Sequence, residues 1–149
     1  MYDNDNRIVM TLDAGGTNFV FSAIQGNKEV VVPVCKSAPV NDLALCLDAL
    51  TDGFEQIKKQ LEKQPVAISF AFPGPADYEH GVIGDLPNFP AFRGGVALGK
   101  YLEHKFKVPV YINNDGNLFA YGEALTGILP ELNRKLKKAG NDKQFKNLI

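Results

Sequence analysis

The stretch MTLDAGGTNFVFSAI, Met10 to Ile24, places one aspartate, two adjacent glycines and a threonine between two runs of strand-forming residues. A hairpin needs only a two-residue turn, and Gly-Gly is enough for it, so the hairpin alone explains Gly15 and Gly16. It requires neither Asp13 before the glycines nor Thr17 after them. What these two side chains do depends on what the rest of the chain places beside them.

Length and composition indicate one domain, or one lobe of a larger protein: the chain has 149 residues, of which 45% are hydrophobic. The formal net charge of −1 gives no sign of a nucleic-acid or membrane partner. No apolar run approaches the roughly 20 residues of a membrane span, and the polar start MYDNDNR is unlike a signal peptide. We expect Cys35 and Cys46 to be buried free thiols, in a cytoplasmic protein.

Hydrophobic periodicity predicts the order βββαβαβα, in which a meander of three strands precedes alternating helices and strands. This order indicates an α/β fold with a mixed five-stranded sheet and helices packed on it. The stretch 73–92, rich in proline and glycine, predicts a long functional loop. The expected strands are 7–13, 18–25, 29–36, 65–72 and 108–113, and the expected helices are 41–63, 96–105 and 116–125, followed by a short basic helix and a loose tail.

The glycine turn has the composition of a site for a nucleotide and a metal ion. Adjacent glycines let backbone N–H groups approach an anion with no Cβ in the way, and Thr17 adds a hydroxyl. Asp13 would repel a phosphate, but it can hold Mg²⁺ through water, and the ion can bind the phosphate. The turn follows the end of a strand, where ligands collect in sheets of this kind.

A second motif, NNDGN at 113–117, follows the last predicted strand and opens a helix. The helix dipole favours the ionised form of Asp115. Such a carboxylate suffices as a general base when it takes a proton from a hydroxyl late in a phosphoryl transfer. Asn114 can bind a sugar hydroxyl. The alternative is a helix N-cap, because Asp and Asn are favoured at that position.

Together these motifs resemble a known family. The stretch LDAGGTNFVFSAI resembles the first phosphate motif of the actin-like sugar-kinase superfamily. The stretches AFPGPADYEHGVI, LPNFPAF and VPVYINNDGNLFAYGEA resemble the ROK family of sugar kinases and sugar-responsive repressors, and the resemblance runs from about residue 7 to residue 127. It implies a ribonuclease H-like (actin-like ATPase) N-terminal lobe over 1–127, with 128–149 a basic helix and tail at the crossover to a missing C-terminal lobe.

The resemblance also implies a sugar substrate, with ATP and Mg²⁺, and it assigns roles to particular residues. A homodimer is compatible with it, and it gives no nucleic-acid or membrane partner. The implied residues are Gly15, Gly16 and Thr17 for the nucleotide phosphates, Asp13 for Mg²⁺ through water, Asp115 as general base, and Gly74, Asn88, Asn114 and Asp115 for the sugar.

The chain departs from the family in what it lacks. The family's second phosphate motif, adenosine pocket and zinc site are not matched in this sequence, and His80 and His104 do not fit the zinc pattern. The leading hypothesis is therefore one lobe of a glucokinase-like sugar kinase, with the isolated chain expected to be inactive. Two alternatives remain: the sugar-sensing domain of a ROK repressor, which the early first strand disfavours, and a non-catalytic sugar-binding module.

Overall fold

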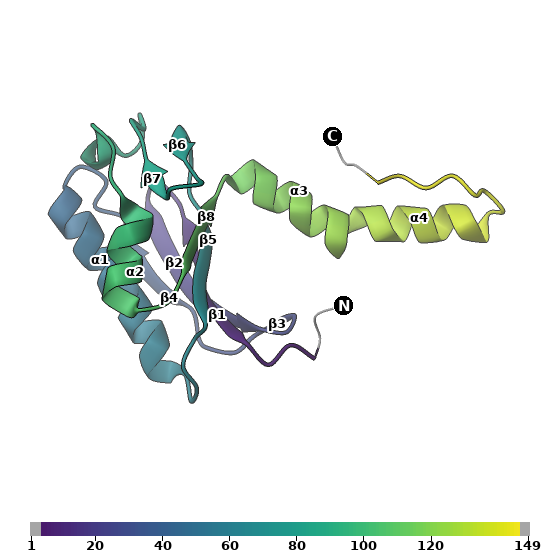
Figure 1. Cartoon of the computed structure of the whole chain (residues 1–149), viewed down its shortest axis with the longest axis horizontal. Helices are drawn as coiled ribbons and strands as arrows, with labels where there is room; N and C mark the ends of the chain where they lie inside the picture. The colour runs from purple at the N-terminus through teal and green to yellow at the C-terminus, as the bar shows by residue number, and fades with distance from the viewer. Residues whose placement is uncertain (1–3, 147–149) are drawn as a thin grey trace. The chain divides into compact units, whose positions relative to one another are not determined.

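In the computed structural model, which describes residues 4–146, the chain forms two compact units (Figure 1). The first unit, residues 1–113, is here called the sheet unit; its described part, 4–113, holds every strand that the structure describes, together with the helices α1 and α2. Residues 114–149, the helical unit, contain α3 (Asp115–Leu125) and α4 (Ile128–Lys138). These units divide the chain after Asn113, whereas the lobe predicted from the sequence extends to residue 127; that boundary stays a prediction. No helix within residues 4–146 is both long and apolar enough to cross a bilayer.

The main sheet is six-stranded and mixed. Its strand order is β3-β2-β1-β5-β8, and β4 also pairs with β2. β1 pairs antiparallel with β2 and parallel with β5, which is in turn parallel to β8. The strands are β1 (Ile8–Ala14), β2 (Asn18–Gln25), β3 (Lys28–Glu29), β4 (Val34–Ser37), β5 (Ala67–Ala71) and β8 (Val110–Asn113).

Two helices cover one face of this sheet, and a small hairpin follows β5. The helices are α1 (Leu43–Gln60) and α2 (Leu98–Phe106); the hairpin pairs β6 (Ala76–Asp77) with β7 (Val82–Ile83), and the 3₁₀ helix η1 (Pro90–Phe92) comes between the hairpin and α2. Asp42 caps α1, because its side chain accepts a hydrogen bond from the Leu45 N–H at 3.0 Å.

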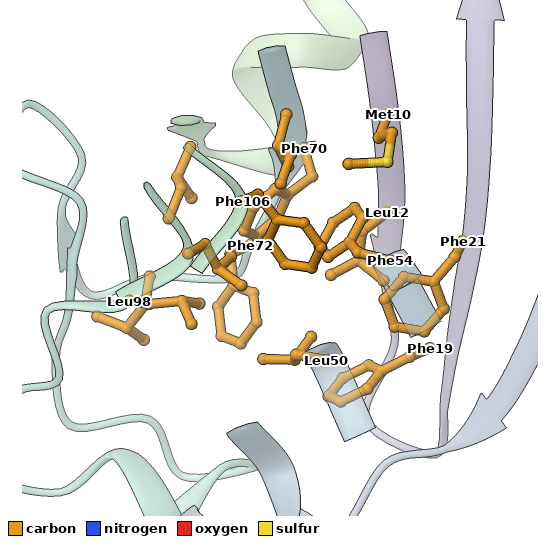
Figure 2. Packing of buried hydrophobic residues seen from close by; sticks show 14 of the residues in the cluster. Met10, Leu12, Phe19, Phe21, Leu50, Phe54, Phe70, Phe72, Leu98 and Phe106 are labelled. Atoms are coloured by element: carbon orange, nitrogen blue, oxygen red, sulfur yellow. The ribbon is translucent and has the colours of Figure 1, made fainter. Parts of the chain in front are cut away.

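The core lies between the sheet and these two helices, and phenylalanine rings fill much of it (Figure 2). Alternation along β1 turns Met10 and Leu12 into the core, while Asp13 is exposed. From α1, the Phe54 ring packs edge to face against Phe21 of β2 at 5.1 Å and against Phe106 of α2 at 5.7 Å between ring centroids. These contacts tie both helices to the same face of the sheet.

The predicted fold class is confirmed, and some details of the prediction are wrong. The main sheet has six strands rather than five, and the expected loop 73–92 contains the hairpin β6–β7 and the 3₁₀ helix η1. The expected strand 29–36 is two short strands, β3 and β4, because Pro33 has no N–H and the side chain of Gln60 takes both backbone groups of Val32, at 3.0 and 3.1 Å. Cys35 is exposed rather than buried, because it lies on the outward side of β4, whereas Cys46 is buried as expected.

Candidate functional site

The strand register brings three predicted motifs to one edge of the sheet. β1, β5 and β8 are parallel, and Asp13 is paired with Ala71, which is paired with Asn113. Two strand spacings of about 4.8 Å separate Asp13 from Asn113, so these two residues lie roughly 10 Å apart. The glycine turn, the Pro-Gly-Pro loop and the Asn-Asp-Gly motif all start at this carboxyl edge, where ligands bind in α/β sheets.

The two glycines of the turn have different surroundings. The Gly15 N–H donates to the Asn18 carbonyl at 3.0 Å, and a Cβ at Gly15 would lie 3.0 Å from that oxygen. At Gly16 a Cβ would have nothing within 4 Å, and no acceptor within the described residues takes the N–H of Gly16 or Thr17. The hairpin therefore uses Gly15, and the donors left for an anion are those of Gly16 and Thr17.

Asp13 presents a carboxylate beside these donors. Its side chain is exposed at the end of β1, and the carboxylate makes no hydrogen bond or ion pair with another residue of the described range 4–146. Within that range no three His, Cys, Asp or Glu side chains gather as a metal cluster. One exposed carboxylate close in the chain to unused backbone N–H groups suits Mg²⁺, which keeps several waters and takes its other ligands from substrate phosphates.

The loop that carries Gly74 follows β5 and is held by backbone contacts. The Tyr78 hydroxyl donates to the Phe72 carbonyl at 2.9 Å, and the Gly84 N–H donates to the Pro75 carbonyl at 3.0 Å. The Gly74–Pro75 peptide bond is cis. A Cβ at Gly74 would lie 3.0 Å from the Tyr78 hydroxyl, so this exposed glycine leaves room for that bond.

His80 belongs to the neighbouring hairpin turn. Its N–H donates to Asp77 Oδ1 at 3.1 Å, and its ring Nδ1 lies 2.8 Å from Oδ2. These hydrogen bonds from His80 hold the pKa of Asp77 below its usual value. Both residues therefore serve the turn between β6 and β7.

Asn88 lies at the exposed tip of a loop that is anchored in the core. Phe89 and Phe92, which follow it, are buried, and their ring centroids lie 5.2 and 5.4 Å from that of Phe72. Because Phe72 is only two residues before Gly74 and Phe89 directly follows Asn88, the same aromatic cluster anchors both loops predicted to border the sugar. The phenylalanines among prolines in LPNFPAF indicate from the sequence that this loop is anchored, but only the fold shows that they pack against the ring of Phe72.

In the helical unit the N-cap and the predicted base are different residues. Asn114 caps α3, because its Oδ1 accepts from the Asn117 N–H at 3.3 Å. Asp115 is the first residue of the helix; it is exposed, and its Oδ1 accepts from the Gly116 N–H at 2.8 Å. The cap alternative therefore applies to Asn114 and does not account for Asp115.

Comparison with known proteins identifies the family to which this chain belongs. A sequence model described as the ROK family matches residues 9–131, so the chain belongs to the ROK family. The lobe of actin-like ATPase type predicted from the sequence is thereby confirmed. A comparison with curated protein sequences gave no match.

Among solved structures, a glucokinase from Parabacteroides distasonis is 68% identical, with a TM-score of 0.90; the match covers 98% of this chain and 41% of that chain. A ROK hexokinase from Thermus thermophilus is 28% identical, with a TM-score of 0.68 and coverage of 78% and 38%. A ROK family transcriptional regulator, homologous to the E. coli MLC protein, shares the fold at 21% identity and a TM-score of 0.69, over 81% of this chain and 31% of that one. The chain thus spans well under half of each.

Proposed function

We propose that this chain supplies the phosphate turn and the general base of a ROK sugar kinase that transfers the γ-phosphoryl group of ATP to a hexose or hexose derivative, as a glucokinase does. The observation that carries the proposal is Gly16, a glycine that the turn itself does not need, beside the exposed carboxylate of Asp13. An open Cβ position next to unused N–H groups is what close approach of a phosphate requires. The 68% identity to a glucokinase supports the same substrate class.

In this mechanism the chain positions the reactants and moves one proton. The N–H groups of Gly16 and Thr17 hold phosphate oxygens of ATP, while Asn88 and the backbone at Gly74 border the sugar. Asn114 binds a sugar hydroxyl. Asp115 takes the proton of the attacking hydroxyl as its oxygen bonds to the γ-phosphorus, while the bond from that phosphorus to the β–γ bridging oxygen breaks and ADP leaves. Mg²⁺, held by Asp13 through water, would supply charge neutralisation on the phosphates.

The isolated 149-residue chain is proposed to be inactive. Its turn offers two unused N–H donors and one carboxylate, which hold the phosphates from one side only. Transfer needs the γ-phosphoryl group in line with the hydroxyl, and a misplacement of about 1 Å costs on the order of 100-fold in rate. A coupled assay for ADP on the purified chain with glucose, fructose, mannose or N-acetylmannosamine should show no turnover; robust sugar-dependent turnover would refute this part of the proposal.

The decisive test of the base is Asp115→Asn in the longest gene product that contains this chain. The amide can still accept the Gly116 hydrogen bond, so folding is preserved, but it cannot take a proton. We expect kcat for glucose to fall by about two to four orders of magnitude, with little change in KM, because the lost role is confined to the transition state. Near-normal turnover in this variant would show that Asp115 is not the general base.

A second candidate function is sugar sensing without catalysis, and the structural match to a ROK transcriptional regulator favours it. The coupled assay for ADP, run on the longest gene product that contains this chain, separates the two functions. A sensor binds the sugar but consumes no ATP in its presence, so glucose binding by calorimetry together with a flat coupled assay would favour the sensor.

A further inference from the structure

We propose that Asp85 is a positioning residue that holds the loop carrying Asn88 closed, so that Asn88 meets the sugar in one fixed place. The inference rests on the proposed function, and nothing in the sequence pattern assigned a role to Asp85. It is carried by one hydrogen bond: Asp85 Oδ1 accepts from the Gly94 N–H at 2.7 Å, across nine residues of chain.

The loop is a closed structure with Asn88 at its tip. At its base, Ile83 and Val96 exchange two backbone hydrogen bonds of 2.9 and 2.8 Å. Leu86 and Phe89 are buried on either side of the exposed residues Pro87 and Asn88. The tip is therefore anchored immediately beside Asn88, and the buried Phe92 anchors the start of the returning arm. What remains to be fixed is the segment 93–95, between Phe92 and the paired Val96.

The segment 93–95 is exposed and lies between the buried Phe92 and the paired Val96. Gly94 and Gly95 are exposed and have φ of +85° and +86°, a region that favours glycine, and a Cβ at Gly94 would meet nothing within 4 Å. Packing therefore does not hold Gly94. The Asp85 carboxylate does, through a charge-assisted bond of the short, strong kind, which adds a second link between the two arms, between the Ile83–Val96 pair and the tip that carries Asn88.

Because the Asp85 side chain is exposed, a positioning role and a structural role for its hydrogen bond to Gly94 predict different results. Asp85 is exposed, so losing its hydrogen bond should change global stability little. The effect should instead be local, on the placement of the tip, and sugar contacts lose affinity when their supporting residues are loose. A variant lacking the bond should therefore bind sugar less well while it unfolds at nearly the same temperature.

The test compares three variants in the longest gene product that contains this chain. Asp85→Ala should raise KM for glucose about tenfold, with KM for ATP unchanged within about twofold. Asp85→Asn keeps an acceptor oxygen and should recover most of this loss. Asp77→Ala is the matched control, because Asp77 is also an exposed carboxylate that caps a turn, in the adjacent hairpin, and it should leave both constants unchanged.

Amide hydrogen exchange at Gly94 in the 149-residue chain gives a readout that does not depend on activity. Gly94 should be protected in the wild type and in Asp85→Asn, and unprotected in Asp85→Ala. An unprotected Gly94 in the wild type overturns the inference whatever the activity. Loss of protection with an unchanged KM for glucose also overturns it, because the bond is then structural only.

Failure of the proposed function gives different results from failure of the positioning role. If no ATP is consumed with any sugar, the kinase proposal falls, and calorimetric affinity of the same variants for glucose replaces KM. Weaker glucose binding in Asp85→Ala, with Asp77→Ala unaffected, would still support positioning. Equal affinity in all variants, or no glucose binding by the wild type, would overturn it.

Discussion

The glycine turn at 14–17 and the loop at 84–95 carry predicted ligand contacts in the sheet unit, and they are supported in opposite ways. The turn is held by a few backbone hydrogen bonds, such as Ala38 N–H to the Thr17 carbonyl at 2.9 Å, and its residues are mostly exposed. The loop is held by rings buried in the core. In the turn, therefore, ligand contact can change without loss of stability. In the loop, ligand placement and stability are linked only at the buried anchors Phe89 and Phe92, and not at the exposed residues Asp85 and Asn88.

The largest expected effect on stability is at the loop anchor. Phe89→Ala removes a buried ring that contacts Phe72, Phe92 and Phe19 and should lower the free energy of unfolding by about 3–5 kcal/mol. Asn88→Ala, one residue away but exposed, should change it by less than about 0.5 kcal/mol. Urea unfolding of the 149-residue chain measures both, and equal losses would remove the distinction between anchor and tip.

The two glycines of the turn should respond with opposite signs. Gly15→Ala puts a Cβ 3.0 Å from the Asn18 carbonyl oxygen and should cost about 1 kcal/mol of stability. Gly16→Ala has open space and should be neutral or stabilising by up to about 1 kcal/mol. In a kinase that contains this chain, however, Gly16→Ala should raise KM for ATP on the order of tenfold, because the new methyl group keeps the phosphate away from the N–H groups. An unchanged KM for ATP would mean that the phosphates do not approach this turn.

The two cysteine thiols allow the buried core and the exposed surface to be compared by chemical reactivity, without any change in stability. Burial raises the pKa of Cys46 to about 11, so at pH 8 this thiol is protonated and shielded and should not react with a thiol reagent such as DTNB. Cys35 is exposed and should react under the same conditions. One thiol per native chain, and a second only after unfolding in urea, is the expected count. Two fast-reacting thiols in the native chain would show that α1 does not pack as described.

Much of the candidate site was predictable from sequence because its motifs are local. An aspartate, two glycines and a threonine between two apolar runs indicate a hairpin turn with a role beyond the hairpin, and Asn-Asp-Gly before a helical pattern indicates a strand end followed by a helix start. The Asp85–Gly94 bond and the Tyr78–Phe72 bond could not be predicted. Each joins a side chain to a backbone group whose position depends on the path of the loop.

The sequence by itself determined the α/β class, the apolar stripe of α1 and a capped start of that helix at Asn41 or Asp42, because periodicity and capping act within a few residues along the chain. Only the tertiary structure decided the rest. Gly53 has no local reason in the middle of α1, but a Cβ there would overlap the Phe21 ring of β2. Likewise, strand register alone aligns Asp13 with Ala71 and Asn113, far apart in the chain. Such contacts depend on which surfaces meet when the sheet and helices pack, and the local sequence pattern does not specify that.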